Sequence, residues 1–341
     1  MPGDHDAQYA SPWAGANFLP MSTQENSRWE RRTWPELRRL AVEVPEAGIH
    51  LQKALVYRNA KDLDVRCGGG LSEDLFAPEP WYSTFFPDYR KVPASELPPG
   101  TAYGHEFGSV CINTAIYLAW LVGQCRKLGV VIKRASLSHI SEAASLHYAH
   151  EHDAAPANPS SKDDIIVVNA TGLLACQLGG VMDKAVQPAR AQVVVVRNDS
   201  PAMYSISSTD NDPPEELVYS MTRAVGGGTI LGGTYDKGNW DPAPDPAIAQ
   251  RIMQRIVAKF PQIAPRVDAL DVVRHAVGLR PYRDGGVRLD KELVDGVWVV
   301  HNYGHAGWGF QGSYGTAERV VELVGDITGR TAGAPHHSAR L

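Results

Sequence analysis

Apolar residues recur at helical spacing in four parts of the chain and predict four helices. Residues 24–43 form the first, with Trp29, Trp34, Leu37 and Leu40 placed to face a core. The other expected helices are residues 116–128, 247–260 and 316–324. Asn113 is the expected N-terminal cap of the second helix, and Gly129 is expected to end it in a left-handed conformation.

Short apolar runs bounded by glycine, proline or polar residues predict strands. The expected strands are residues 48–59, 109–112, 130–132, 165–168, 192–196, 217–223, 229–235, 276–279 and 298–300. The run at 165–168 is apolar throughout and predicts a fully buried strand. Residues 217–223 and 229–235 flank three glycines and predict a hairpin. Residues 199–216 read as a polar loop that acts as a lid, and residues 81–90 as a cover over a cavity or as a hydrophobic cluster.

Helices, strands and hairpins mix here without a regular βαβ rhythm, which predicts an α/β or mixed α+β fold. The 341 residues, 43% of them hydrophobic and 21% charged, allow one large domain or two interleaved domains. The net charge of -5 gives no reason to expect nucleic acid or a membrane surface as a partner. No apolar run approaches the ~18 residues of a membrane span, and no secretory signal is expected. Four scattered cysteines form neither a zinc pattern nor a disulfide framework and suit a reducing compartment.

One arginine stands out because an apolar strand leads directly into it. Arg280 follows residues 276–279 and precedes Pro281, which is expected to end the strand pairing. An unpaired buried charge is costly, and the planar guanidinium matches a carboxylate through two parallel hydrogen bonds. Arg280 is therefore either the binder of a substrate carboxylate or a member of a structural ion pair. This segment by itself leaves both alternatives open.

Glycine-rich turns after two expected strands predict where the backbone approaches a ligand. Residues 165–168 lead into Asn169-Ala170-Thr171-Gly172, and open α/β sheets bind ligands at such strand ends. Residues 301–315 form a second glycine-rich loop ahead of the helix at 316–324. His301 and His305 flank a turn in it, and loop geometry explains them as well as catalysis does. His139, His147, His150 and His152 are candidate metal ligands, but the last three are unevenly spaced beside a polar loop, where a solvated surface cluster explains them, so no metal is expected.

The last residues, Ala339-Arg340-Leu341, are similar to the peroxisomal address of the Ser-Lys-Leu type. Residues 331–341 are expected to form a flexible tail that a peroxisomal import receptor binds. Without that signal the chain is expected to be cytoplasmic.

Four motifs together resemble the D-amino-acid oxidase family, in that family's order and spacing. They are NATGLLACQLGG at 169–180, the hairpin ending in GGTY at 232–235, VGLRPYRDGGVRL at 277–289 and HNYGHAGWGFQGSYG at 301–315. SPWAGANFLP at 11–20, VCIN at 110–113 and FPDYRKVPASELPPG at 86–100 resemble the fungal members in particular. The resemblance extends from Pro2 to about Val324.

The resemblance implies FAD as cofactor, a D-amino acid and molecular oxygen as small-molecule partners, and oxidation to a 2-oxo acid, ammonia and hydrogen peroxide. Arg280 and Tyr219 match residues that bind the substrate carboxylate, Tyr235 matches the second active-site tyrosine, and Gly307 matches a position beside the substrate amine and the flavin. The remaining matches are to flavin-contacting positions: Ser11, Ala14, Gly15, Asn17, Thr171, Gly172, Gly304, His305, Ala306, Gly309, Phe310 and Gln311. Tyr235 indicates neutral substrates, because D-aspartate oxidases tend to have an arginine there. Ala191 departs from the glycine that the family favours.

The family also implies an opening apolar strand, a G-x-G-x-x-G turn and a helix that together hold the FAD adenosine and pyrophosphate, and the sequence has no such strand-turn-helix segment. We therefore expect an incomplete FAD-binding Rossmann-like domain (1–60, 100–190 and 290–330) interleaved with an antiparallel-sheet substrate domain (60–100 and 190–290). Two hypotheses follow. The chain is a D-amino-acid oxidase with a shortened or misassigned start, which the retained Arg280, Tyr219 and Tyr235 favour, or it is a catalytically silent binding protein. D-aspartate oxidase is the alternative activity.

Overall fold

The computed structural model describes residues 6–63, 73–146, 165–207, 213 and 215–329. The helices are α1 (Arg28–Glu43), α2 (Thr114–Lys127), α3 (Pro246–Lys259) and α4 (Ser313–Thr328). The strands are β1 (Ile49–Asn59), β2 (Arg90–Lys91), β3 (Thr101–Ile112), β4 (Ile166–Asn169), β5 (Val186–Val196), β6 (Met203–Ile206), β7 (Glu216–Thr222), β8 (Thr229–Thr234), β9 (Asp236–Lys237), β10 (Val272–Arg283), β11 (Lys291–Val294) and β12 (Val297–His301).

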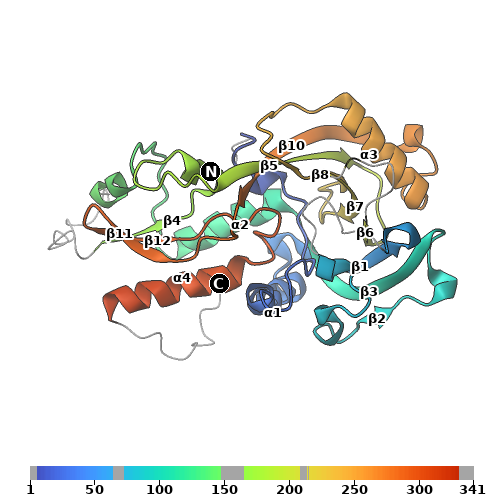
Figure 1. Cartoon of the computed structure of the whole chain (residues 1–341), viewed down its shortest axis with the longest axis horizontal. Coiled ribbons are helices and arrows are strands. Elements are labelled where there is room, and N and C mark those ends of the chain that lie inside the picture. The colour runs from blue at the N-terminus through green and yellow to red at the C-terminus, as the bar shows by residue number, and fades with distance from the viewer. Residues whose placement is uncertain (1–5, 64–72, 147–164, 208–212, 214, 330–341) are drawn as a thin grey trace.

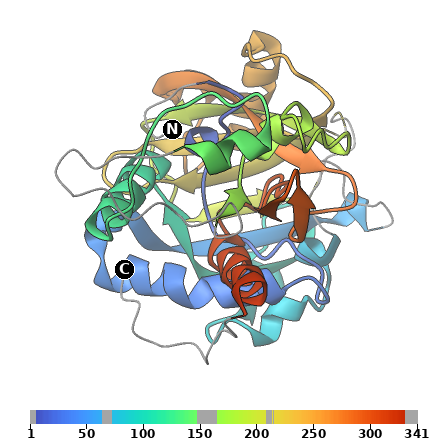
Figure 2. The ribbon, with the colours of Figure 1, turned by 90° about the vertical axis from the view of Figure 1, so that its left-hand side faces the viewer.

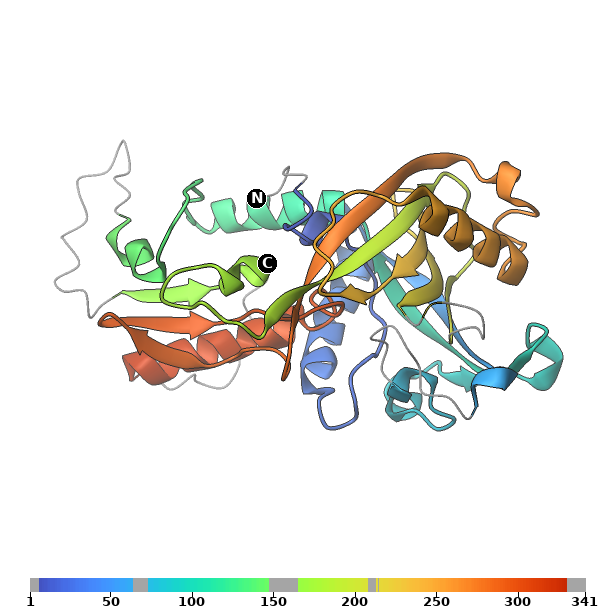
Figure 3. The same cartoon turned by 45° about the horizontal axis from the view of Figure 1, so that its top comes forward.

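The larger sheet has nine strands in the order β10-β5-β8-β7-β6-β1-β3-β2, with β9 paired to β5. Its pairs are antiparallel except for β1 with β6, so the sheet is mixed. The long strands β5 and β10 run side by side (Figure 3). Helix α3 covers β5, β7 and β8, and its apolar face buries Ile252 and Ile256 against the sheet.

The smaller sheet has three strands, with β12 between β11 and β4. It lies beside the larger sheet, and α4 packs against β12 (Figure 1). In Figure 2 helix α4 is seen end-on beside α1, and the two helices are in contact. This arrangement confirms the mixed α/β fold class. The division into an FAD-binding and a substrate domain stays a prediction, and β1 and β3, from its FAD-binding ranges, lie in the larger sheet.

The main core joins α1 to the larger sheet through aromatic side chains. Trp34 of α1 packs on Phe86 with ring centroids 5.1 Å apart, and Phe86 stacks on Phe107 of β3 at 4.4 Å. Trp81 and Tyr82 belong to the same cluster. Residues 81–90 therefore form a hydrophobic cluster and do not cover the cavity described below, whose lining excludes them.

All four predicted helices and the hairpin across the three glycines are confirmed. Gly129 has the expected left-handed φ of 80°. Asn113 is the N-cap residue of α2, as predicted, but its side chain makes no cap hydrogen bond and its Nδ2 donates to the Ala224 carbonyl (2.9 Å). None of the helices in the described part of the chain has the length and apolar character that a membrane span requires.

Four strand predictions need correction. Residues 130–132 are not a strand, and Val130 and Val131 are about half exposed. Val168 in β4 is 48% exposed, so this strand is not fully buried. Strand β6 interrupts the predicted loop at 199–216, because it pairs with β1 and β7. Pro281 does not end the pairing of β10, since Pro281 lies opposite Pro188 and the ladder continues to Arg283.

Candidate functional site

A cavity of about 440 Å³ lies between the two sheets, in the size range of small-molecule sites. Segments from most of the chain line it, including the carboxyl ends of the parallel strands β4 and β12. Every residue that the sequence analysis proposed for catalysis or flavin contact lies in its wall: Ser11, Ala14, Gly15, Asn17, Thr171, Gly172, Tyr219, Tyr235, Arg280, Gly304, His305, Ala306, Gly307, Gly309, Phe310 and Gln311. The structure thus brings all of these residues together, while their individual roles stay predictions.

Arg280 reaches this cavity from β10, opposite Ala189 of β5. Its Nη1 donates to the Thr234 carbonyl at 2.9 Å, and its guanidinium lies 5.2 Å from the centre of the Tyr235 ring. Within the described residues Arg280 forms no ion pair with a carboxylate, whereas its neighbour Arg283 pairs with Asp183 at 2.8 Å. Of the two alternatives left open by the sequence, the described structure supports the anion binder.

Two phenols flank Arg280. Tyr219 in β7 lies opposite Gly232, where a Cβ would come within 1.9 Å of its ring, so only glycine leaves room for this tyrosine. Burial raises the pKa of Tyr219 and the nearby Arg280 lowers it. Tyr235 directly follows β8, and burial raises its pKa to about 12. Both phenols are therefore neutral hydrogen-bond donors near pH 7.

Gly307 leaves open space in front of the guanidinium. A Cβ at this position would lie 3.7 Å from Tyr235, and 3.8 Å from both the Arg280 side chain and the Met21 methyl group. A side chain would therefore enter the space that these residues enclose. The arrangement suits a small anionic group held by Arg280 and Tyr219, with the Gly307 backbone beside it.

Residues 14–17 and Gly172 form another part of the cavity wall. Residues 14–17 run along the end of β3, where Ala16 and Ile112 exchange backbone hydrogen bonds of 3.1 and 2.8 Å. Arg223 holds the same segment by donating to the carbonyls of Ala14 and Gly15. Gly172, with a φ of 61°, turns the chain at the end of β4. Several glycines in the wall of this cavity leave room for a flat ring system, such as the flavin ring of FAD.

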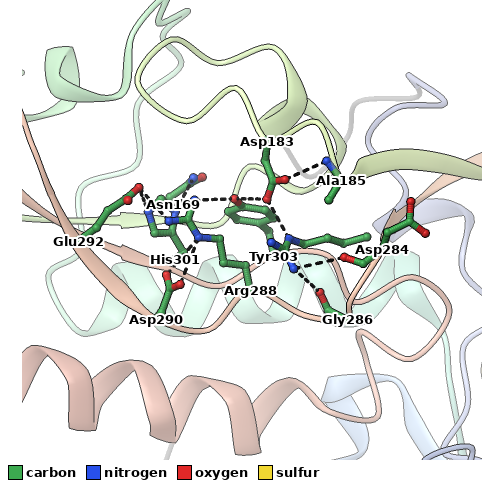
Figure 4. A network of polar contacts seen from close by, with 11 residues as sticks. Asn169, Asp183, Ala185, Asp284, Gly286, Arg288, Asp290, Glu292, His301 and Tyr303 are labelled. Carbon is green, nitrogen blue, oxygen red and sulfur yellow. Dashed lines mark hydrogen bonds and ion pairs between the residues drawn. The ribbon is translucent and has the colours of Figure 1, made fainter.

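A network of hydrogen bonds and ion pairs lies at the carboxyl ends of β4 and β12, next to the cavity (Figure 4). Asn169 Oδ1 accepts from the Thr171 hydroxyl at 2.8 Å, so Asn169 Nδ2 faces His301 Nδ1 at 3.1 Å. His301 Nε2 then donates to Glu292 at 3.0 Å. His301 is fully buried, and burial lowers its pKa. His301 therefore positions Thr171 as a neutral side chain.

The network continues through a shared phenol. The Tyr303 hydroxyl donates to Asp183 at 2.8 Å and accepts from Arg288 at 3.2 Å, and Arg288 also pairs with Glu292 at 2.9 Å. His305 lines the cavity itself, and burial lowers its pKa to about 4. Neither His301 nor His305 carries a positive charge near pH 7.

Two other sequence expectations concern residues outside the cavity. His147, His150 and His152 and the C-terminal tail lie outside the described residues. Among the residues that the structure describes, no group of three histidine, cysteine or acidic side chains is placed to hold a metal ion.

Sequence reasoning missed several residues at the site. Met21 lines this cavity, and Tyr282 and Lys237 line a second cavity beside it. The residue types and their spacing in the sequence did not indicate any of the three. Glu30 lies behind the wall, where it accepts from Gln311 Nε2 at 2.8 Å. One feature of the sequence indicated a buried polar role for Glu30, which is an isolated glutamate in the otherwise apolar face of the helix at 24–43.

Comparison with known proteins gives consistent similarities. The profile of the FAD dependent oxidoreductase family (DAO) matches residues 3–323. A D-amino-acid oxidase of Fusarium vanettenii is 55% identical over 97% of this chain and 89% of the relative. A D-aspartate oxidase of Talaromyces thermophilus is 30% identical over 93% of this chain and 79% of the relative.

Solved structures share the fold at low sequence identity. A glycine oxidase from Bacillus cereus superposes with a TM-score of 0.65 at 14% identity, covering 98% of this chain and 90% of that one. A glycine oxidase from Geobacillus kaustophilus gives a TM-score of 0.64 at 17% identity, covering 96% and 86%.

Proposed function

The chain belongs to the family of FAD dependent oxidoreductases, and on that premise we propose that it catalyses the oxidative deamination of neutral D-amino acids. The oxidation gives an imino acid, which water hydrolyses to a 2-oxo acid and ammonia, and molecular oxygen accepts the two electrons and becomes hydrogen peroxide. The observation that carries the proposal is Arg280, a cation that faces the cavity between two phenols and pairs with no carboxylate of the described residues.

FAD is the cofactor of the family, and the cavity wall fits its ring system. Residues 14–17, Thr171, Gly172 and 304–311, which line the cavity, would hold the flavin. Bound FAD supplies the acceptor for the hydride of the substrate α-carbon and delivers the electrons to oxygen.

The protein side chains bind and orient the substrate. Arg280 and the Tyr219 hydroxyl hold the substrate carboxylate, and a charge-assisted pair of this kind fixes both position and angle. Gly307 keeps the space beside the α-carbon free, and its backbone lies next to the substrate amine. Tyr235 limits the opposite side and offers a neutral hydroxyl there, which favours neutral side chains over that of aspartate. The reaction then depends on orientation, with no acid or base required at the α-carbon.

The similarity to a D-aspartate oxidase makes acidic substrates the second candidate. The test is to purify the chain with added FAD and to measure oxygen consumption with D-alanine, L-alanine and D-aspartate. We expect turnover of D-alanine well above that of D-aspartate and none of L-alanine. Bound flavin without turnover of any D-amino acid would favour the silent binding protein. Preference for D-aspartate would favour the second candidate.

The proposal includes a location. Ala339-Arg340-Leu341 binds the peroxisomal import receptor, which would place a producer of hydrogen peroxide in that compartment. A fluorescent protein fused ahead of the chain should enter peroxisomes, and the same fusion lacking residues 339–341 should stay in the cytoplasm. Equal distribution of the two fusions would contradict this part.

A further inference from the structure

A second cavity, of about 320 Å³, adjoins the first. The two share Met21, Tyr235, Gly304, Ala306 and Gly307 as wall residues. The outer cavity adds Lys237, Tyr282, Arg283, Gly286 and Trp308. A side chain that extends from a substrate held at Arg280 therefore has a route past Tyr235 toward these residues.

The sheet places Lys237 on the same face as Arg280. Arg280 of β10 lies opposite Ala189 of β5, and Ala189 lies opposite Lys237 of β9. Residues directly opposite one another in antiparallel strands point to the same face, and neighbouring strands lie ~5 Å apart. The two cations therefore start from Cα atoms about 10 Å apart in one row.

Aromatic rings line the space between the two cations. The guanidinium of Arg280 lies 5.2 Å from the centre of the Tyr235 ring. Tyr235 meets Tyr282 edge to face at 6.4 Å, and the ammonium group of Lys237 lies 4.1 Å from the centre of the Tyr282 ring. Contact with an aromatic face restrains the long lysine side chain.

The charges of the outer cavity are unequal. Arg283 is paired with Asp183 at 2.8 Å, so its charge is compensated. Lys237 forms no ion pair with a carboxylate of the described residues and remains the uncompensated cation at this wall. An anionic group that enters the outer cavity would meet it.

We propose that Lys237 is a specificity-determining residue and that the outer cavity binds the terminal carboxylate of longer D-amino acids of the D-glutamate class. This rests on the proposed function, because Arg280 must hold the α-carboxylate. The rings of Tyr235 and Tyr282 lie between the cations, and the side chain of D-glutamate reaches one methylene group further toward Lys237 than that of D-aspartate. Neutral substrates use the inner cavity, and D-glutamate gains the additional contact.

The experiment compares D-glutamate with its neutral isostere D-glutamine. In Lys237→Met the ratio of kcat/KM for D-glutamate to that for D-glutamine should fall about 2- to 5-fold, the range of a partly exposed ion pair. Lys237→Glu should lower the ratio further. Lys237→Arg keeps the positive charge and should leave the ratio close to that of the unmodified chain. In the unmodified chain, raising the salt concentration should lower kcat/KM for D-glutamate more than kcat/KM for D-glutamine. In Lys237→Met this difference should be absent. Lys127→Met, which removes a charge at the end of α2, is the matched control and should leave the ratio unchanged.

Binding without turnover gives an independent measurement. Calorimetry of the FAD-loaded protein should show glutarate binding weakened by Lys237→Met more than pentanoate binding. Unchanged ratios and unchanged glutarate affinity in both Lys237→Met and Lys237→Glu would overturn the inference while the proposed function stands. If the unmodified chain oxidises no neutral D-amino acid, the proposed function fails and this inference fails with it.

Discussion

Replacing Arg280 by methionine tests the substrate role of Arg280 most directly. The change keeps much of the aliphatic length and removes the charge. Among the described residues Arg280 donates to the Thr234 carbonyl, lies against the Tyr235 ring and interacts with the Tyr219 hydroxyl. Their loss should lower the free energy of unfolding by about 1–2 kcal/mol.

The effect of Arg280→Met on catalysis should be much larger. Removing one partner of a hydrogen-bonded charge pair in a cavity costs about 2–5 kcal/mol, which corresponds to roughly a 30- to 5,000-fold loss of kcat/KM for D-alanine. The assay is oxygen consumption at saturating FAD, with urea unfolding and the flavin absorbance spectrum recorded for the same protein. Flavin should remain bound, because the proposed flavin wall lies on other segments.

Arg283→Met is the matched control on the same strand. It breaks a half-buried pair with Asp183 and should cost about 1–3 kcal/mol of folding stability, similar to Arg280→Met. Its kcat/KM for D-alanine should fall less than about tenfold, since the Arg283 charge is already compensated. If both variants lost activity equally, or if Arg280→Met kept kcat/KM within about threefold, Arg280 would not be the carboxylate binder.

Three further predictions concern the cavity wall and two buried carboxyl groups. Gly307→Ala places a methyl group 3.7 Å from Tyr235 and should lower kcat/KM for D-alanine about tenfold or more. The Tm should not change. Unchanged kinetics would mean that the substrate does not use this space. Burial raises the pKa of Glu30 from 4.5 to about 7, so the native state keeps a proton that the unfolded chain has lost. The free energy of unfolding should therefore fall by up to about 3 kcal/mol as pH rises through this interval, and urea titrations should show no such fall in Glu30→Gln. Glu216→Gln weakens the buried acceptor of Arg251 and Arg255 and should cost about 3 kcal/mol in urea unfolding. Glu322→Gln, in an exposed pair, should cost less than about 1 kcal/mol, and equal losses would contradict the importance of burial.

Local sequence was enough to predict several elements because their causes lie within a few residues. The start of α3 is an example: Asp245 accepts from the Ala247 amide at 2.7 Å, and Pro246 occupies the first turn. The hairpin across residues 226–228 and the turn at Gly172 depend on glycine in left-handed or tightly packed backbone, which the residue type itself permits. The residues that the motifs indicated also line one cavity, and their roles stay predictions.

Predictions failed where a distant partner decides the outcome. Residues 130–132 have the composition of a strand, but the backbone hydrogen bonds of a strand require a neighbour, and the described structure pairs them with none. Met203–Ile206 lie in a polar stretch, yet they are a strand because β1 and β7 flank them. Asn113 begins α2 as its N-cap residue, but its side chain is oriented toward a distant partner, the Ala224 carbonyl, to which Nδ2 donates.

The sequence by itself determined the helices, the hairpin, the glycine turns and many, though not all, of the residues around the cavity. Only the tertiary structure decided how each charge is compensated. The sequence could not distinguish Arg280 from Arg283, because their difference is a carboxylate about 100 residues away that reaches one and not the other. The same holds for Glu30 and Gln311, which are 281 residues apart in the chain and 2.8 Å apart in space. Electrostatic pairing depends on distance in space, and chain folding alone sets that distance.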